Sequence, residues 1–285
     1  MTSKTVLPPL TQIPASLQTI ADYEIEAEKH LPEMVWHYLQ GGAMDEISVR
    51  NNLAQFQNLH LMPRMLRDLT QGNTSCEILG QTFPHPIFVA PIGHQQQFHP
   101  EAEAATALAA EVLGSNMILS TFTNTDMRTL KPENPYKWFQ LYWQGDRDKS
   151  LALLKLAEAQ HFTAIVITVD SPHTGIRDRE RRAFFHLPEN MQHPHTPAHI
   201  PLPELQEGDH PVFNGLMKIA PTWDDIAWMV QQTDLPILLK GIVSPLDAQL
   251  AIQHGIQGLI VSNHGGRVLD TCIPPLKALQ LIKKA

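Results

Sequence analysis

A histidine, two glycines and an arginine follow an apolar run in the stretch IVSNHGGRVLD, residues 260–270. His264 can act as a general base, because the ordinary pKa of histidine lies near neutrality. Arg267 can hold a carboxylate through two parallel hydrogen bonds. Gly265 and Gly266 allow the backbone to come close to a planar ligand. The pattern predicts proton chemistry on an anionic small molecule.

Other polar residues stand at the ends of further apolar runs. Tyr142 lies in KWFQLYW, Asp170 ends TAIVITVD and is followed by Arg177, and Lys240 lies in LPILLKGI. A carboxylate beside a histidine fixes the tautomer and stabilises the imidazolium. A buried lysine can stabilise negative charge on a cofactor or form a Schiff base. Because no G-x-S-x-G motif occurs, the set favours proton or hydride chemistry over acyl transfer.

Six apolar runs, nearly all followed by helical segments, organise the chain from residue 84 onward; they are HPIFVAP, NMILSTF, KWFQLYW, TAIVITVD, LPILLKGI and QGLIVSN. Such alternation is typical of a parallel sheet covered on both faces. A doubly wound sheet and a TIM (β/α)8-type barrel both fit. Polar residues at many strand ends favour the barrel. The first turn, APIGHQQQFHPE, also lacks the G-x-G-x-x-G of a dinucleotide fold.

The segments between these runs predict the helices. We expect one or two helices over residues 22–42, ending at Gly41 and Gly42. Further helices are expected over residues 100–114, 124–130, 146–160, 222–233, 244–255 and 274–285. Residues 1–20 are expected to form an extended arm, and residues 21–285 the barrel domain.

Residues 171–221 form one long excursion rich in proline and histidine, which is typical of a lid or binding loop. His193, His195 and His199 could suggest a metal site. Since no cysteine or acidic constellation accompanies them, we interpret the segment as a solvated flexible loop without a metal.

Composition narrows the class of protein. The chain has 285 residues, a formal charge of −8 and 43% hydrophobic residues, as in an ordinary globular protein. The negative charge argues against nucleic-acid or anionic-membrane partners. Two cysteines favour a reducing cytoplasm, and neither a signal peptide nor a membrane-spanning run is recognisable.

Several segments, taken in order, resemble the FMN-dependent α-hydroxy-acid oxidase/dehydrogenase family, which includes glycolate oxidase, lactate oxidase and L-lactate dehydrogenase. They are LPEMVWHYLQGGAMDE, PIFVAPIGHQQQFHPEAE, WFQLYWQGDRD, ITVDSPHTGIRDRE, LPILLKGIVSPLDAQLAIQHG and SNHGGRVLD. The resemblance implies a TIM barrel that holds FMN at the strand C-termini. It also implies oxidation of a lactate-like L-2-hydroxy acid to the 2-oxo acid, with O2 or another electron acceptor.

The resemblance implies roles for individual residues. His264 would be the base, and Asp170 would stabilise its charged form. The substrate would be bound by Arg267, Arg177, Tyr38 and Tyr142, the two tyrosines also assisting catalysis. The residues implied to contact FMN are Pro91, Ile92, Gly93, Ser120, Gln140, Thr168, Lys240 and Ser262.

The chain departs from the family pattern in two places. The family continues with two more strands, which carry a DGG-x-R-like segment and a G-R turn that hold the FMN phosphate. We therefore expect an incomplete barrel of about six strand–helix units with exposed edges. Phe122 stands where the family often has tryptophan or tyrosine, and His94 lies near the expected flavin edge.

Three functions stay open at this point. The first is an FMN-dependent 2-hydroxy-acid oxidase or dehydrogenase that forms a homo-oligomer. The second is a non-catalytic fragment of such an enzyme that needs a complementing C-terminal chain to complete the barrel. The third is a different barrel enzyme that uses Lys240 as a Schiff base.

Overall fold

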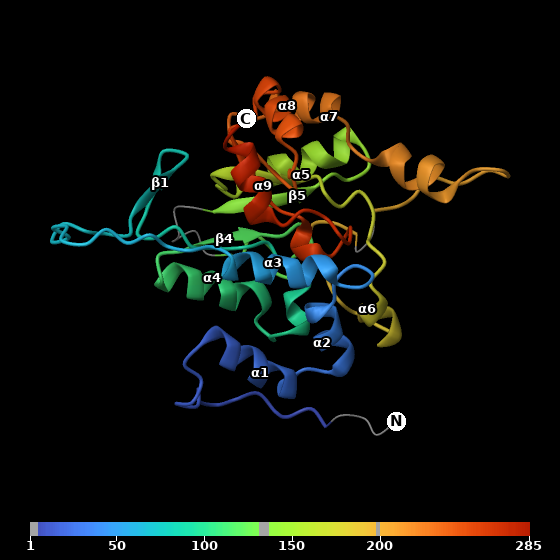
Figure 1. Cartoon of the computed structure of the whole chain (residues 1–285). Coiled ribbons are helices and arrows are strands. Elements are labelled where there is room, and N and C mark those ends of the chain that lie inside the picture. The colour runs from blue at the N-terminus through green and yellow to red at the C-terminus, as the bar shows by residue number, and fades with distance from the viewer. Residues whose placement is uncertain (1–4, 131–136, 198–199) are drawn as a thin grey trace.

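A curled sheet of six parallel strands forms the centre of the computed structural model, which describes residues 5–130, 137–197 and 200–285 (Figure 1). The strands lie in chain order, so each pairs with the next one in sequence. They are β3 (Phe88–Val89), β4 (Asn116–Leu119), β5 (Trp138–Tyr142), β6 (Ala164–Thr168), β7 (Ile237–Lys240) and β8 (Gly258–Ile260). All six predicted runs are confirmed as strands.

Helices connect most of these strands. They are α4 (Ala102–Val112), α5 (Arg147–Ala159), α7 (Trp223–Val230), α8 (Pro245–Gln253) and, after the last strand, α9 (Pro275–Ile282), which confirms the corresponding predictions. The short helix expected over residues 124–130 is wrong, because that stretch forms turns. The Asp126 carboxylate accepts hydrogen bonds from the backbone and guanidinium of Arg128 at 2.9 Å. Such local bonds offer the backbone an alternative to helix.

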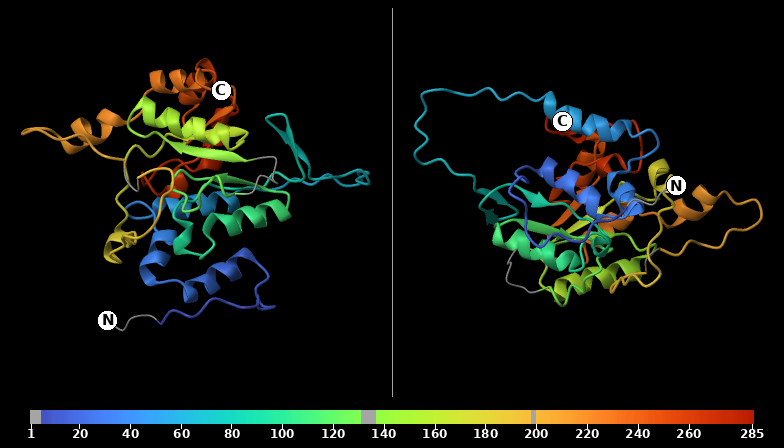
Figure 2. Two further views of the ribbon diagram at one scale, coloured as in Figure 1. Left: turned by 180° about the vertical axis from the view of Figure 1, so that it is seen from behind. Right: turned by 90° about the horizontal axis from the view of Figure 1, so that it is seen from below.

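The N-terminal part contains three helices and a hairpin. The predicted pair is α1 (Ile20–His30) and α2 (Glu33–Gln40), separated at Pro32 and ended by Gly41. Helix α3 (Ile47–Gln57) and the antiparallel hairpin of β1 (Cys76–Ile78) and β2 (Gln81–Phe83) were not predicted. The segment that joins α3 to β1 loops away from the body of the molecule (Figures 1 and 2).

The two faces of the sheet have separate cores, because successive side chains of a strand point to opposite faces. The helix-covered face buries, among others, Leu119, Phe139, Leu141, Ile165, Ile167 and Leu239. The inner face of the curl buries Ile118, Trp138, Ala164, Val166 and Leu238, with Leu79 of the hairpin packed against them. The inner face is therefore the interior of the barrel.

Every second residue along a strand continues the inner face, and these positions become polar where the strands end. Ile118 is followed by Ser120, Leu238 by Lys240, and Ile260 by Ser262. The alternation explains how an apolar barrel interior gives way to a polar surface at one end. The candidate site is built on that end.

The sheet does not close into a full barrel within the described residues. Its order runs from β3 to β8 without a pairing between these two strands, which confirms the expected incomplete barrel. The excursion at residues 171–221 carries a short helix, α6 (Asp178–Arg182), and projects from the strand C-termini (Figure 1). Among the helices that the structure describes, none is long and apolar enough to cross a membrane.

Candidate active site

His264 leaves β8 in a tight turn and faces the end of β6. Three successive residues, His264, Gly265 and Gly266, have positive φ angles of 57°, 66° and 74°. The turn brings His264 Nδ1 to 2.7 Å from Asp170 Oδ1. Since a carboxylate oxygen accepts, Nδ1 donates its proton and Nε2 is left as the basic nitrogen. The predicted base and its carboxylate are thus brought together.

Gly241 makes room for Asp170. Its φ is +114°, and a Cβ placed there would lie 2.5 Å from both Cβ and Cγ of Asp170. Real Cβ atoms do not tolerate such a distance, so any side chain at this position would displace the carboxylate from His264.

The substitution Gly241→Ala is therefore expected to lower the thermal stability and to cost about 1–3 kcal/mol in the free energy of unfolding. Gly255→Ala is the matched control, because Gly255 also has a positive φ of +78° but its Cβ would make only an ordinary 3.4 Å contact with Val230. Thermal unfolding of both variants checks this expectation. Equal losses would show that backbone strain, and not the contact with Asp170, sets the cost.

Two arginines share one glutamate beside the N-terminal helices. Arg177 Nη1 lies 3.0 Å and Arg267 Nη2 lies 3.1 Å from Glu180 Oε1. Arg267 Nη1 also donates to the backbone oxygens of Tyr38, at 2.8 Å, and Gly41, at 2.5 Å. Both guanidinium groups lie over the Tyr38 ring, at 5.9 Å and 5.0 Å. The cluster carries one net positive charge, which suits one substrate carboxylate.

Glu180 is the functional residue that the sequence reasoning missed. It is buried, and burial raises the pKa of its carboxyl, while Arg177 and Arg267 oppose that rise. The available signal was its spacing, because Glu180 stands one helical turn after Arg177 on α6.

Tyr142 lies beside the base. Its hydroxyl is 3.3 Å from His264 Nε2, and burial raises the pKa of the phenol. The phenol therefore stays protonated and donates to Nε2 or to a ligand oxygen that takes this place.

A row of polar side chains crosses five strand ends on the inner face. Gln140 accepts from Ser120 Oγ at 3.3 Å and donates to Thr168 Oγ1 at 3.0 Å. Lys240 Nζ donates to Ser262 Oγ at 3.2 Å. Burial lowers the pKa of Lys240, while Asp170 opposes the shift. Among the described residues, Lys240 has no carboxylate partner at ion-pair distance, so its half-buried amine is part of the row without an ion pair.

The predicted loop after β3 lies on the same side. Pro91, Ile92 and Gly93 follow β3, and a Cβ on Gly93 would come within 3.0 Å of Phe122 Cβ. Beyond them, His94 stacks on the Phe122 ring at 5.5 Å and lies 6.3 Å from the Tyr38 ring. All fourteen predicted site residues therefore come from elements that meet at the strand C-termini.

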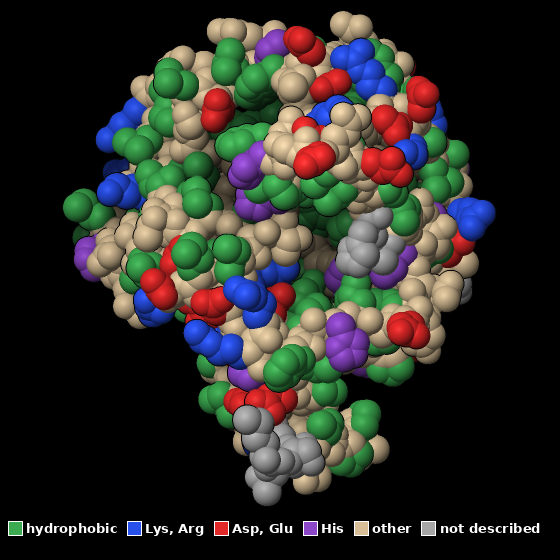
Figure 3. Space-filling model, turned by 90° about the vertical axis from the view of Figure 1, so that its right-hand side faces the viewer, with side chains coloured by type: hydrophobic (Ala, Val, Ile, Leu, Met, Phe, Trp, Pro, Cys, Tyr) green, Lys and Arg blue, Asp and Glu red, His purple; other side chains and the backbone are tan. Residues whose placement is uncertain are grey.

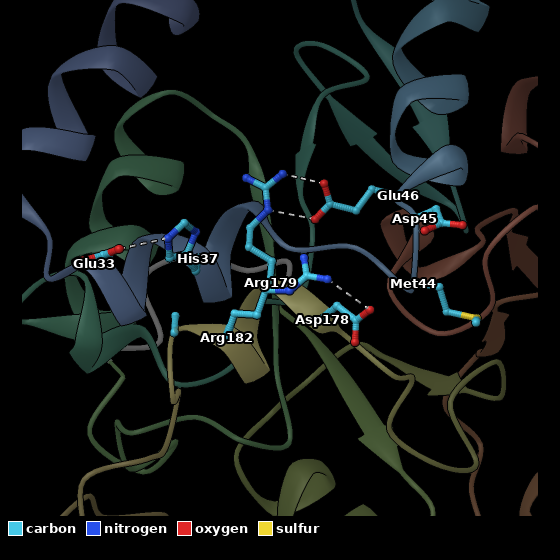
Figure 4. Close-up of a pocket in the computed structure, with 9 residues that line it drawn as sticks. Glu33, His37, Met44, Asp45, Glu46, Asp178, Arg179 and Arg182 are labelled. Atoms are coloured by element: carbon cyan, nitrogen blue, oxygen red, sulfur yellow. Dashed lines mark hydrogen bonds and ion pairs between the residues drawn. The ribbon is translucent and has the colours of Figure 1, made fainter. Parts of the chain in front are cut away.

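A cleft of about 480 Å³ lies on the outer side of α6 (Figure 4). The Arg179 guanidinium pairs with the Glu46 carboxylate there, and Arg182 lies 3.8 Å from Asp178. Each of these arginines thus already has a carboxylate neighbour. We interpret these ion pairs as the contacts that fix the outer side of α6. Glu180 lies on its inner side, where it pairs with Arg177 and Arg267.

The long excursion at residues 171–221, called the lid loop below after the expectation from its sequence, contacts the turn after β4 through His195. Its Nε2 accepts the backbone N–H of Met127 at 2.9 Å and lies 3.5 Å from Asp126 Oδ1. Only a neutral imidazole accepts in this way. Burial lowers the pKa of His195, whereas hydrogen bonds from Arg128 hold the pKa of Asp126 at about 2.

The contact of this loop with the turn after β4 should therefore weaken as the pH falls. An opened His195 takes up a proton below its ordinary pKa of 6.5, whereas the closed form resists protonation, so the closed form loses stability on acidification. We expect faster papain cleavage of the lid at about pH 5.5 than at about pH 7.5, with rates normalised to an unstructured peptide. In His195→Gln the amide oxygen still accepts the Met127 N–H but does not titrate, so the difference should disappear. An unchanged difference in this variant would refute the expectation.

Comparisons with known proteins decide the family. A family model described as FMN-dependent dehydrogenase matches residues 27–285. The chain belongs to the FMN-dependent dehydrogenase family. This confirms the family resemblance of the six segments quoted above. It also confirms the barrel architecture and the cofactor, FMN, which that resemblance implied.

Individual members of the FMN-dependent dehydrogenase family resemble the chain over most of its length. L-lactate oxidase of Roseobacter sp. (strain GAI101) is 40% identical over 273 residues, covering 94% of this chain and 73% of that protein. Spinach (Spinacia oleracea) glycolate oxidase is 35% identical over 277 residues, covering 94% and 74%. A crystal structure of mandelate oxidase with benzoyl-formic acid has a TM-score of 0.82 at 35% identity, covering 92% of this chain and 72% of that chain.

The side chains present fit the ring of an FMN. A planar ring with polar edges needs hydrogen-bond donors and acceptors that lie in one layer. The row from Ser120 to Ser262 at the strand ends supplies such a layer. The half-buried Lys240 can match negative charge on such a ring, and Asp170 Oδ2 is a buried oxygen without a partner among the described residues. The donor set therefore agrees with the cofactor of the family.

Proposed function

We propose that the chain oxidises a lactate-like L-2-hydroxy acid to the 2-oxo acid with FMN as its cofactor. The observation that carries the proposal is the 2.7 Å contact of His264 with Asp170 on the same sheet end as the Arg177–Glu180–Arg267 cluster. The similarity to proteins named L-lactate oxidase, 2-hydroxyacid oxidase and glycolate oxidase supports the same reaction.

The substrate is held by its carboxylate. Arg267 and Arg177 together exceed the charge of Glu180 by one, so they bind one carboxylate, and the Tyr38 ring beneath both guanidinium groups keeps them in place. Binding of the carboxylate directs the hydroxyl-bearing carbon toward His264 and Tyr142. The Tyr142 hydroxyl oxygen lies 3.3 Å from His264 Nε2.

His264 moves the proton. Its Nδ1 proton is held by Asp170, so Nε2 accepts a proton from the substrate and the resulting imidazolium is stabilised by the carboxylate. Tyr142, kept protonated by burial, donates to the substrate oxygen. The chemistry that FMN would supply when bound is the acceptance of two electrons and of the second hydrogen that the substrate loses. We assign to FMN the side chains of Lys240, Ser120, Gln140, Thr168 and Ser262 and the backbone of Pro91, Ile92 and Gly93.

The electron acceptor and the assembly are further parts of the proposal. Similarity to several proteins named oxidases supports O2 as the acceptor. A homo-oligomer and a cytoplasmic location stay predictions from the resemblance and from the two cysteines. Size-exclusion chromatography with light scattering measures the first.

Reduction of bound FMN tests the proposal. The purified chain is mixed with FMN, and its visible spectrum is followed anaerobically as L-lactate is added. Binding and bleaching of the flavin support the proposal, and recovery of the colour on admitting air supports O2 as acceptor. A protein that binds no FMN, or whose FMN stays oxidised with all 2-hydroxy acids, supports the alternative, a non-catalytic fragment that needs a complementing chain.

A further inference from the structure

The hydroxyl of Tyr38 makes no hydrogen bond to any residue that the structure describes, although its ring lies in the cluster of arginines that would bind the substrate. Burial raises the pKa of this phenol, so the hydroxyl keeps its proton and can donate it to a ligand. The side of the molecule that carries α6 is hollowed, with acidic and basic side chains beside the hollow (Figure 3). The position of the Tyr38 ring therefore depends on the side chains that pack against it.

Phe185, which lies in the lid loop just after α6, is the aromatic ring closest to Tyr38 among the described residues. The two rings are stacked, with centroids 4.4 Å apart and an angle of 12° between their planes. Phe98 and His94 also contact the Tyr38 ring, but their centroids lie 6.2 and 6.3 Å away. Stacking stabilises a pair of rings beyond the burial of their surfaces, so Phe185 is the main contact that fixes the plane of Tyr38.

The end of α6 places Phe185 in this position. The backbone N–H of Phe185 donates to the carbonyl oxygen of Glu180 at 3.0 Å, and that of Phe184 donates to Arg181 at 3.2 Å. Phe184 has a φ of +52°, so these residues form a Schellman cap around one left-handed residue. The cap leaves the Phe184 side chain 83% exposed and brings the next ring, Phe185, onto Tyr38.

Glu180 connects this cap to the arginines. Its carboxylate pairs with Arg177 and Arg267, and its carbonyl oxygen accepts the N–H of Phe185. One short helix therefore carries both the counterion of the two guanidinium groups and the ring that packs on Tyr38. The three groups that would surround a substrate carboxylate are thus held by the same segment of the lid loop.

We propose that Phe185 is a positioning residue, which by stacking on Tyr38 directs the phenol hydroxyl to the substrate carboxylate bound by Arg177 and Arg267. The inference rests on the proposed function and adds a residue to its carboxylate site. The effect of Phe185 on the substrate passes through Tyr38. A hydrogen bond from a hydroxyl to a carboxylate is charge-assisted, so its loss weakens binding measurably.

Phe185→Leu tests the proposal, because leucine keeps an apolar side chain but cannot stack on a ring. In the FMN-loaded protein we expect KM for L-lactate to rise about three- to tenfold, with kcat within about twofold of the original. Phe184→Leu is the matched control, because it makes the same substitution at the neighbouring, exposed residue of the same cap. It should leave both constants unchanged. Neither side chain belongs to the two hydrophobic cores of the sheet, so both variants should fold.

A double-mutant cycle separates positioning from a general structural role. Tyr38→Phe removes the hydroxyl and keeps the ring. If Phe185 acts through this hydroxyl, Phe185→Leu should raise KM by less than about twofold in the Tyr38→Phe background. A second measurement is the dissociation constant of pyruvate, obtained by calorimetry with the same four proteins. Pyruvate offers the same carboxylate without turnover, so its affinity should follow the same pattern.

The outcomes separate this inference from the proposed function. Oxidation of lactate with an unchanged KM in Phe185→Leu overturns the inference alone. An equal rise of KM with and without the Tyr38 hydroxyl shows that Phe185 only supports the lid loop, and it also overturns the inference. If FMN is bound but no 2-hydroxy acid reduces it and pyruvate does not bind, the proposed function fails, and the inference fails with it.

Discussion

Replacement of His264 by asparagine is expected to lower kcat and kcat/KM together by about 10²–10⁴-fold, the usual contribution of a general base. Asparagine offers an amide in place of the Nε2 atom that accepts the proton. It also tolerates the left-handed backbone, so the φ of 57° at this position should persist. Stopped-flow reduction of the flavin by L-lactate measures the effect directly.

The matched control is His161→Asn, which makes the same substitution at an exposed histidine with a φ of +61°. It should leave flavin reduction unchanged. FMN affinity should stay within about twofold in both variants, because we assign His264 to the substrate and not to the flavin. A His264→Asn variant that retains rapid flavin reduction would show that another residue is the base.

The strand-end residues could be predicted because two simple periodicities fix them. An apolar strand buried on both faces shows where the sheet lies, and every second residue stays on the inner face. Ser120, Thr168 and Lys240 each stand two residues after a buried inner-face residue. Parallel strands end at one edge of the sheet, so their terminal polar residues had to meet.

Helix α3 shows why other elements could not be predicted. Its N-cap, Glu46, is in the left-handed region and makes no capping bond with its side chain. The backbone N–H groups of Ile47 and Ser48, which have no acceptor within the helix, donate instead to the Asp270 carboxylate at 3.3 Å and 2.8 Å. This cap comes from the other end of the sequence. No local pattern marks a helix start that is completed by a distant residue.

The contacts of α3 also steady the catalytic turn. Asn52 and Asn263 exchange two hydrogen bonds of 2.9 Å, and Asn263 Oδ1 accepts the backbone N–H of Gly266. Asn263 immediately precedes His264, so the unpredicted helix supports the predicted base. The stacked pair of Tyr38 and Phe185 was missed as a unit for a similar reason, since it joins α2 to the distant lid loop.

Replacement of Arg267 by lysine is expected to raise KM for L-lactate by about 10²-fold, with a smaller loss in kcat. A lysine ammonium cannot reproduce the planar set of donors that reaches Glu180 and the backbone oxygens of Tyr38 and Gly41. It therefore loses both the fixed position and the paired hydrogen bonds to a carboxylate. Steady-state kinetics over a range of lactate concentrations measures both constants.

A structural role and a substrate-binding role of Arg267 predict different results with lactamide, which keeps the hydroxyl but has no negative charge. If the guanidinium binds the carboxylate, the preference for lactate over lactamide should shrink in Arg267→Lys, because the variant loses binding energy that only lactate obtains. Arg179→Lys is the control, since Arg179 pairs with Glu46 on the outer side of α6. It should preserve the preference. Equal losses for both ligands in Arg267→Lys would mean that this arginine only supports the end of α2, and Arg177 would then be the remaining residue to bind the carboxylate.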